Sequence, residues 1–137
     1  MTGHVCVVGG GYGVNRAGLS APKGDTAVAR FSLYDENMQE FDTGDVAAAV
    51  FYVGEGQVCG GTMYAGGEQL FTLSLGSGIA KAADLYTLVV TIPSDKTEVL
   101  ENIWNYFELV ITLNNGQKYT VSSGVLVSPR TMRADGY

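Results

Sequence analysis

The sequence has little histidine and little cysteine. One histidine (His4) and two cysteines (Cys6 and Cys59) stand among 137 residues. A zinc site needs more such ligands, and a Ser-His-Asp or Cys-His constellation would have to be built on His4. The two cysteines form no metal or redox spacing. We therefore expect a protein that is not an enzyme, with no catalytic residues, no cofactor and no metal.

Long hydrophobic runs are also missing. No window of 18 apolar residues exists, so we expect no membrane span. The N-terminus lacks the basic and apolar regions of a secretory signal, which favours reduced thiols at Cys6 and Cys59. Whether these two cysteines pair is left open by the sequence.

Basic residues are the scarcer charge. The chain has 8 Lys and Arg against 14 Asp and Glu, a net charge of −6. Binding to nucleic-acid phosphates is therefore not expected. The acids gather in the middle of the chain, while Arg16 and Lys23 near the start and Arg130 and Arg133 near the end make both ends mildly basic. Two interpretations stay open: basic ends that dock on acidic subunits, or chance in short segments.

Glycine, in contrast, is abundant at 19 residues. A cluster at 9–13 (GGGYG) follows the apolar run VCVV, as in many dinucleotide-binding enzymes. That motif needs a third spaced glycine and a helix directly after it. Val14 or Arg16 occupies the third glycine position, and the Gly, Pro and Ser of residues 18–24 disfavour a helix. The stretch instead favours a flexible or extended N-terminal arm.

From Thr26 on, apolar and polar residues alternate with the period of β-strands. Gly54–Gly56, Gly66–Gly67 and the Asn114-Asn115-Gly116 triplet are expected to turn the chain, the last as a hairpin with positive φ at both central residues. Ser122-Ser123-Gly124 is expected to form a bulge. We expect a loop at 76–83, a helical turn at 96–102, and strands at 26–34, 46–53, 57–64, 70–75, 86–92, 103–113 and 117–127.

Within these strands the alternation predicts which side chains face the core. Apolar residues of one parity, such as Phe31, Leu33, Phe107 and Leu109, are expected to point inward, and Asn105 is expected to point outward. The prediction is an all-β antiparallel sandwich of about seven strands over residues 25–127. Residues 1–24 form the N-terminal arm, and residues 128–137 form a C-terminal tail.

Two further features are candidate sites. The acidic stretch 35–45 has enough oxygen ligands for a cation, but it lacks the sixth-position glycine and closing Glu of an EF-hand. A solvated connection between strands is the favoured interpretation, with cation binding left open. Aromatic residues that line a cleft or anchor a protein interface are the other candidates: Tyr12, Tyr34, Tyr64, Trp104 and Tyr106.

Residues 24–127 resemble a known family. GDTAVARFSLYDENMQEFDTGDVAAAVFYV leads into FTLSL, followed by DLYTLVVTI, YFELVITLNNGQKYTVSSGVLV and a closing SP. This order resembles the immunoglobulin-like domains of tailed-bacteriophage virion proteins, especially the N-terminal domain of baseplate upper proteins. The resemblance implies an immunoglobulin-like fold and a structural part of a virion without enzyme activity.

On this resemblance we expect a decoration or cement protein of the capsid (a minor head protein) that is assembled in the host cytoplasm and docks through its termini. Partners would be major capsid or tail proteins and copies of the chain itself, with no nucleic acid and no membrane. A tail or baseplate module and a carbohydrate- or receptor-binding sandwich are the alternatives. The expected contact residues are Val5, Cys6, Val7, Val8, Tyr12 and Arg16 in the arm and Arg130, Arg133 and Tyr137 in the tail.

Overall fold

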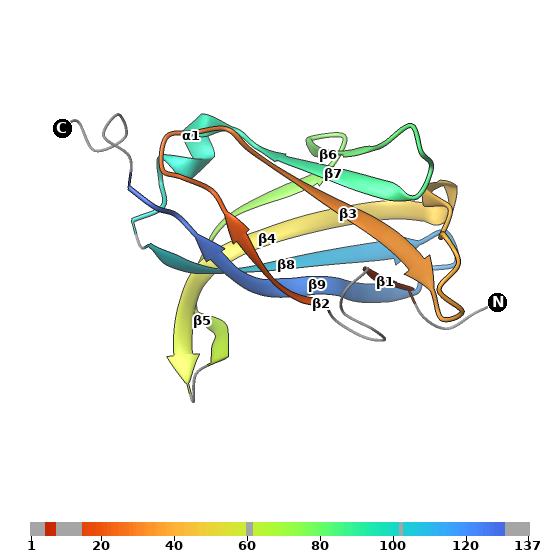
Figure 1. Ribbon diagram of the computed structural model, residues 1–137, viewed down its shortest axis with the longest axis horizontal. Coiled ribbons are helices and arrows are strands. Elements are labelled where there is room, and N and C mark those ends of the chain that lie inside the picture. Colours follow the sequence, from red (N-terminus) through yellow and green to blue (C-terminus); the bar gives the residue numbers. More distant parts are fainter. Residues whose placement is uncertain (1–4, 8–14, 60–61, 102, 131–137) are drawn as a thin grey trace.

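Strands make up most of the chain, as the alternation predicts. The computed structural model describes residues 5–7, 15–59, 62–101 and 103–130. In these residues the fold is all-β, with nine strands, one 3-10 turn and one four-residue helix (Figure 1). The elements are β1 (Val5–Val7), β2 (Asn15–Ser20), β3 (Ala27–Asp35), η1 (Thr43–Asp45), β4 (Val46–Cys59), β5 (Thr62–Leu75), β6 (Gly78–Lys81), β7 (Thr87–Ile92), α1 (Ser94–Thr97), β8 (Trp104–Leu113) and β9 (Lys118–Val127).

The described strands form one sheet that folds over on itself. This sheet is mixed and not purely antiparallel, contrary to the prediction, because β2 pairs with β9 and β5 with β6 in parallel. Its order is β1-β3-β7-β6-β5-β4-β8-β9-β2. The link between β5 and β6 consists of only two residue pairs, Ser74 with Gly78 and Leu75 with Ile79. Here the sheet divides into a β3–β7 layer (β1, β3, β7, β6) and a β4–β8 layer (β5, β4, β8, β9, β2). At the other end β1 contacts β9, so the rolled sheet is nearly a barrel (Figure 1).

The core lies between these two layers and is centred on three phenylalanines. The Phe31 ring from β3 lies 6.3 Å from that of Phe51 on β4 and 6.4 Å from that of Phe107 on β8. Phe51 and Phe107 stack at 5.5 Å. These separations are in the range of favourable aromatic pairs. The inward parity predicted for β3, β5, β7 and β8 is confirmed by buried Phe31, Leu33, Phe71, Leu73, Leu88, Val90, Ile92, Phe107, Leu109 and Ile111.

The segment 46–75 differs from the prediction. Gly54–Gly56 and Gly66–Gly67 do not turn the chain; β4 and β5 run through them as one long hairpin. The register instead shifts at Val53/Gly54 and Gly54/Gly56, which is a bulge. A Cβ on Gly54 would lie 3.2 Å from the Glu68 carbonyl oxygen, so this glycine permits a close approach of backbones. Residues 53, 57, 64 and 70, at which strands are predicted to begin or end, therefore lie inside β4 or β5.

Two shorter elements also differ from the prediction. The expected loop 76–83 contains β6, which pairs with β7 and β5. The expected helical turn at 96–102 begins two residues earlier, as α1. Pro93 precedes it, and its carbonyl accepts hydrogen bonds from the Lys96 and Thr97 amides at 2.9 and 3.2 Å. Pro93 is the N-cap of α1 in an extended conformation, and it has no N–H with which to continue the ladder of β7.

The β8–β9 hairpin is confirmed, with a different turn. Gly116 N donates to Leu113 O at 2.9 Å, and Leu113 N donates to Gln117 O at 2.8 Å. Gly116 has φ +89°, whereas Asn115 is not a positive-φ residue. This is a type I turn followed by a glycine bulge rather than a two-residue turn. The predicted irregularity in β9 lies at Val121, because Leu109 pairs with Ser122 and Val110 with Thr120.

Asn105 points inward, contrary to the prediction. The period of two places it on the same side of β8 as Phe107, and it is fully buried. Its Nδ2 donates to the Leu126 carbonyl at 3.3 Å. A buried amide of this kind is tolerated when it is hydrogen-bonded. The prediction was wrong because it was based on the polarity of Asn105 and not on its position in the alternation of β8.

The end of the expected arm lies within the sheet. Strand β2 pairs in parallel with β9, from Asn15 opposite Ser122 to Ser20 opposite Val127. Ala21 is fully buried and its amide donates to Val127 O at 2.8 Å. Residues 15–21 are therefore part of the folded body, rather than a segment that extends from residue 25. Pairing between segments a hundred residues apart leaves no local signal in the sequence.

Candidate functional site

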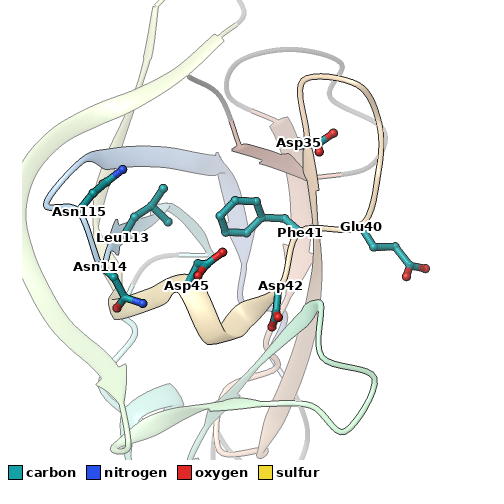
Figure 2. Close-up of a pocket in the computed structure, with 8 residues that line it drawn as sticks. All are labelled: Asp35, Glu40, Phe41, Asp42, Asp45, Leu113, Asn114 and Asn115. Carbon is teal, nitrogen blue, oxygen red and sulfur yellow. The ribbon is translucent and has the colours of Figure 1, made fainter. Parts of the chain in front are cut away.

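A depression with an acidic rim lies at one end of the molecule. The β3–β4 connection and the β8–β9 turn enclose about 500 Å³ (Figure 2). Figure 2 shows the side chains of Phe41 and Leu113 facing this space, while the carboxyl groups of Asp35, Glu40 and Asp42 are spread apart. The lining residues are Asp35, Glu40, Phe41, Asp42, Asp45, Leu113, Asn114 and Asn115.

Two of these carboxylates hold the connection in its own turns. Asp35 Oδ1 accepts hydrogen bonds from the amides of Asn37 and Gln39, both at 2.9 Å. Asp42 Oδ1 accepts from the Gly44 amide at 2.8 Å, at the start of η1. Among the described residues, no group of three or more His, Cys, Asp or Glu is placed to hold a metal ion. The acidic residues are therefore close together in the sequence, but their carboxylates do not converge on one point in the structure.

A second candidate is the outward side of the β4–β8 layer. Cross-strand neighbours form rows on it: Val50, Val110 and Thr120 in one, Gly54, Tyr106 and Val125 in another. Trp104 is 58% exposed, and the others are half-buried. We call this surface the outer face and define it by Val50, Tyr52, Trp104, Tyr106, Glu108, Val110, Thr120, Val125 and Val127.

The outer face contains a hollow of about 340 Å³. Tyr52, Gly54 and Tyr106 line it. Glu108 also lines it, and Tyr106 Oη donates to Glu108 Oε2 at 3.0 Å. Glu108 is the only charged residue among the nine that define the outer face, but Glu55 also lines the hollow. Lys118 stands opposite Thr112 in the next row of β8 and β9. The face and its hollow thus combine aromatic rings, aliphatic side chains and two carboxylates.

The candidate aromatic residues do not form one cluster. Trp104 and Tyr106 share the outer face, whereas Tyr34 belongs to β3 in the other layer. Tyr34 meets Tyr86 edge-on at 5.8 Å between ring centroids. The pKa of Tyr86 is raised above its ordinary 10.0, mainly because of charge interactions with Tyr34 and Glu40. Tyr64 lies in β5, and Tyr12 lies outside the described residues.

Beside this tyrosine pair, Asp84 organises the turn into β7. Its carboxylate accepts from Thr87 Oγ1 at 2.7 Å and from the amides of Tyr86 and Thr87 at 3.0 Å each. These bonds, that of the Thr87 hydroxyl first, hold the pKa of Asp84 below its ordinary 3.8. The group thus has a structural role in this turn.

The predicted arm residues pair within their own chain where they are described. In β1, Val5 lies opposite Asp35, Cys6 opposite Tyr34 and Val7 opposite Leu33. In β2, Arg16 lies opposite Ser123. Cys59 stands at the end of β4, opposite Thr62. Val8 and Tyr12 lie outside the described residues, as does the glycine cluster. The next described element after that cluster is strand β2, not the helix that a dinucleotide site requires.

Of the predicted tail residues, Arg130 binds the body of the molecule. Its guanidinium donates to the carbonyls of Leu100, at 3.0 Å, and Glu101. Lys23 reaches the same place, with Nζ 3.3 Å from Leu100 O and 3.8 Å from Glu101 Oε2. Lys23, after β2, and Arg130, after β9, therefore bind the same segment after α1. Arg133 and Tyr137 lie outside the described residues.

Prediction from the sequence missed the outer face as a unit. Its signal was present: β4 and β8 carry apolar residues at both parities, for example Val50 and Val110 outward with Phe51 and Leu109 inward. A pattern that is apolar at both parities is typical of a central strand, and β4 lies between β5 and β8 in the sheet.

Comparisons with known proteins add no family. No protein-family model matches the chain, and no curated protein matches it either. Within the described ranges, no helix has the length and apolar character needed to span a membrane.

Proposed function

We propose that this chain is a non-enzymatic structural protein of a bacteriophage virion. In this proposal it is an immunoglobulin-like sandwich that decorates or cements the capsid by contacts with major capsid proteins and with its own copies. The contacts are made by the outer face and by the terminal segments. A tail or baseplate position is the alternative within the same class.

The strand order supports the immunoglobulin-like part of this proposal. Giving β3 to β9 the letters B, C, C′, D, E, F and G produces layers ordered B–E–D and C′–C–F–G. Among the described strands this is the arrangement of variable-type immunoglobulin domains apart from their C″ strand. In this assignment β1 beside B and β2 beside G share the role of the first strand.

The single observation that carries the assembly role is the composition of the outer face. Interfaces are enriched in tyrosine and tryptophan and depleted of charge at their centre. Here Tyr52, Trp104 and Tyr106 stand among valines, and the carboxylates are Glu108 and, at the hollow, Glu55. In a chain of net charge −6, such a surface is where contact with another protein costs least electrostatically.

The role of the termini stays a prediction for the residues that the structure does not describe, including Tyr12, Arg133 and Tyr137. Strand β2 and Ala21 belong to the body, so removing residues 1–24 would expose β9 and open the core. A deletion that tests docking by the arm must therefore stop before Asn15.

The experiment is to label phage particles with gold-tagged antibody against this chain and to view them by electron microscopy. Label over the head supports a decoration protein. Label confined to the tail end supports the alternative, a tail or baseplate protein. Particles without label on either the head or the tail contradict the proposal.

The hollow on the outer face favours one second candidate, a carbohydrate-binding sandwich. Paired tyrosines beside a carboxylate supply both a stacking surface and a hydrogen-bond acceptor for a sugar. Binding on a glycan array that is lost in Tyr106→Ala and retained in Val28→Ala, on the other layer, would support this candidate. An array without binding by the folded chain would eliminate it.

A further inference from the structure

The outer face has a feature that bears on its partner: it is apolar and nearly uncharged, whereas the chain as a whole is acidic. Val50 pairs with Val110 at its centre, and Tyr106 pairs with Val125 beside them. We propose that two copies of this chain associate face to face through the outer face. This inference rests on the proposed function, because it names one of the partners there.

Charge is the argument for a second copy as the occupant. Two copies of charge −6 repel each other over most approaches. On the outer face the carboxylates are Glu108 and, at the hollow, Glu55, out of 14 Asp and Glu in the chain, so this approach brings few like charges into contact. Added salt should therefore strengthen the association by screening the remaining repulsion. A basic partner protein on the same surface would show the opposite salt dependence.

Area sets the expected strength of the association. Strands lie about 4.8 Å apart and rise about 3.3 Å per residue, so the three strands of the outer face, with about nine residues each, present about 430 Å². Two such faces bury about 860 Å², which is the size of a weak, transient contact and not of a permanent dimer. A dimer of this size is expected to be weak, with a Kd of about 10–100 µM. It would form at the high local concentration of an assembling particle.

Symmetry makes the inference specific. A two-fold dimer uses the same patch on both copies, so a residue close to the axis meets its own counterpart. Val110 is the centre of the outer face in the strand order β4-β8-β9. Glutamate at this position should oppose dimerisation, and so should lysine, but a mixture of the two variants should associate by opposite charge.

The test is sedimentation of the full chain over a concentration series, with Val110→Glu, Val110→Lys and their mixture. Val28→Glu is the matched control, since Val28 is 61% exposed on β3 in the other layer. Each single change at Val110 should raise the Kd at least about tenfold, the mixture should restore association, and Val28→Glu should leave it unchanged. If Val110→Glu does not fold, Val125→Glu on β9 takes its place.

Trp104 provides a second measurement. It is the only tryptophan of the chain and it lies on the outer face. Its emission should shift to the blue with concentration in the wild type and in Val28→Glu, but not in Val110→Glu. A chain that stays monomeric at about ten times the expected Kd, or a Val28→Glu variant that dissociates equally, overturns the inference. In that case, continued incorporation of the monomer into particles would leave the proposed function standing.

Discussion

Thr97 joins the N-terminal segment to α1. Its side chain is fully buried; Oγ1 accepts from the Gly24 amide at 3.0 Å and lies 2.8 Å from the Asp25 carbonyl, to which it donates. A threonine at the end of a single helical turn has this effect because one hydroxyl can satisfy two backbone groups. This hydroxyl therefore helps to hold the connection from β2 to β3, together with the backbone bonds from Lys23 N to Pro129 O and from Asp25 N to Pro22 O.

Thr97→Val should lower the free energy of unfolding by about 1–3 kcal/mol, because valine fills the same space and leaves these backbone groups unpaired. Urea unfolding followed by circular dichroism measures the loss. Thr91→Val, at an exposed position of β7, is the control and should change stability by less than about 0.5 kcal/mol. Equal losses in the two variants would show that the hydrogen bonds of the Thr97 hydroxyl do not contribute to the free energy of unfolding.

Asp84 gives a prediction on pH. Its folded pKa is lowered, so its contribution to stability is present above its ordinary 3.8 and is lost as the pH falls through the lower, folded value. The Tm of Asp84→Asn should therefore lie below that of the wild type at neutral pH, and the difference should shrink as the pH falls below about 4. In Thr87→Val, carbon-13 NMR titration should find the Asp84 pKa higher. A difference in Tm that does not vary with pH would contradict the assignment.

Among the elements, the β8–β9 turn depends on one backbone conformation. Gly116 has φ +89° and open space around it, so a methyl group there meets strain and no clash. Gly116→Ala should cost about 1–2 kcal/mol. Gly18→Ala, also in open space but outside the positive-φ region, should be neutral or stabilise by about 0.5 kcal/mol. Thermal unfolding compares the two, and an equal loss would show that φ at Gly116 does not decide the cost.

The elements also show what a sequence can predict. Strands β3, β7 and β8 alternate cleanly, since each has one side in the core, and their buried residues could be assigned in advance. Strand β6 buries only Ile79, so it has no alternation to detect. The glycines at 54–56 and 66–67 were interpreted as turns because glycine is common in both turns and bulges. Local composition does not distinguish these two uses.

At the scale of the whole molecule, the pairing of strands that are distant in the sequence could not be predicted. The pairing of β1 with β3 and of β2 with β9 decides that residues 15–21 belong to the body. The outer face likewise exists only once β4, β8 and β9 are neighbours, because its rows take one residue from each strand. In contrast, the acidic stretch 35–45 looked like a site in the sequence, yet its carboxylates cap turns and diverge (Figure 2).

The proposed role in a virion rests on the outer face as the contact surface. The most direct measurement is the amount of chain incorporated into purified phage particles for the wild type, Val110→Glu and Val28→Glu, each first shown to be folded by circular dichroism. We predict that Val110→Glu is lost from the particles while Val28→Glu is retained at the wild-type level. Normal incorporation of a folded Val110→Glu chain would contradict the account.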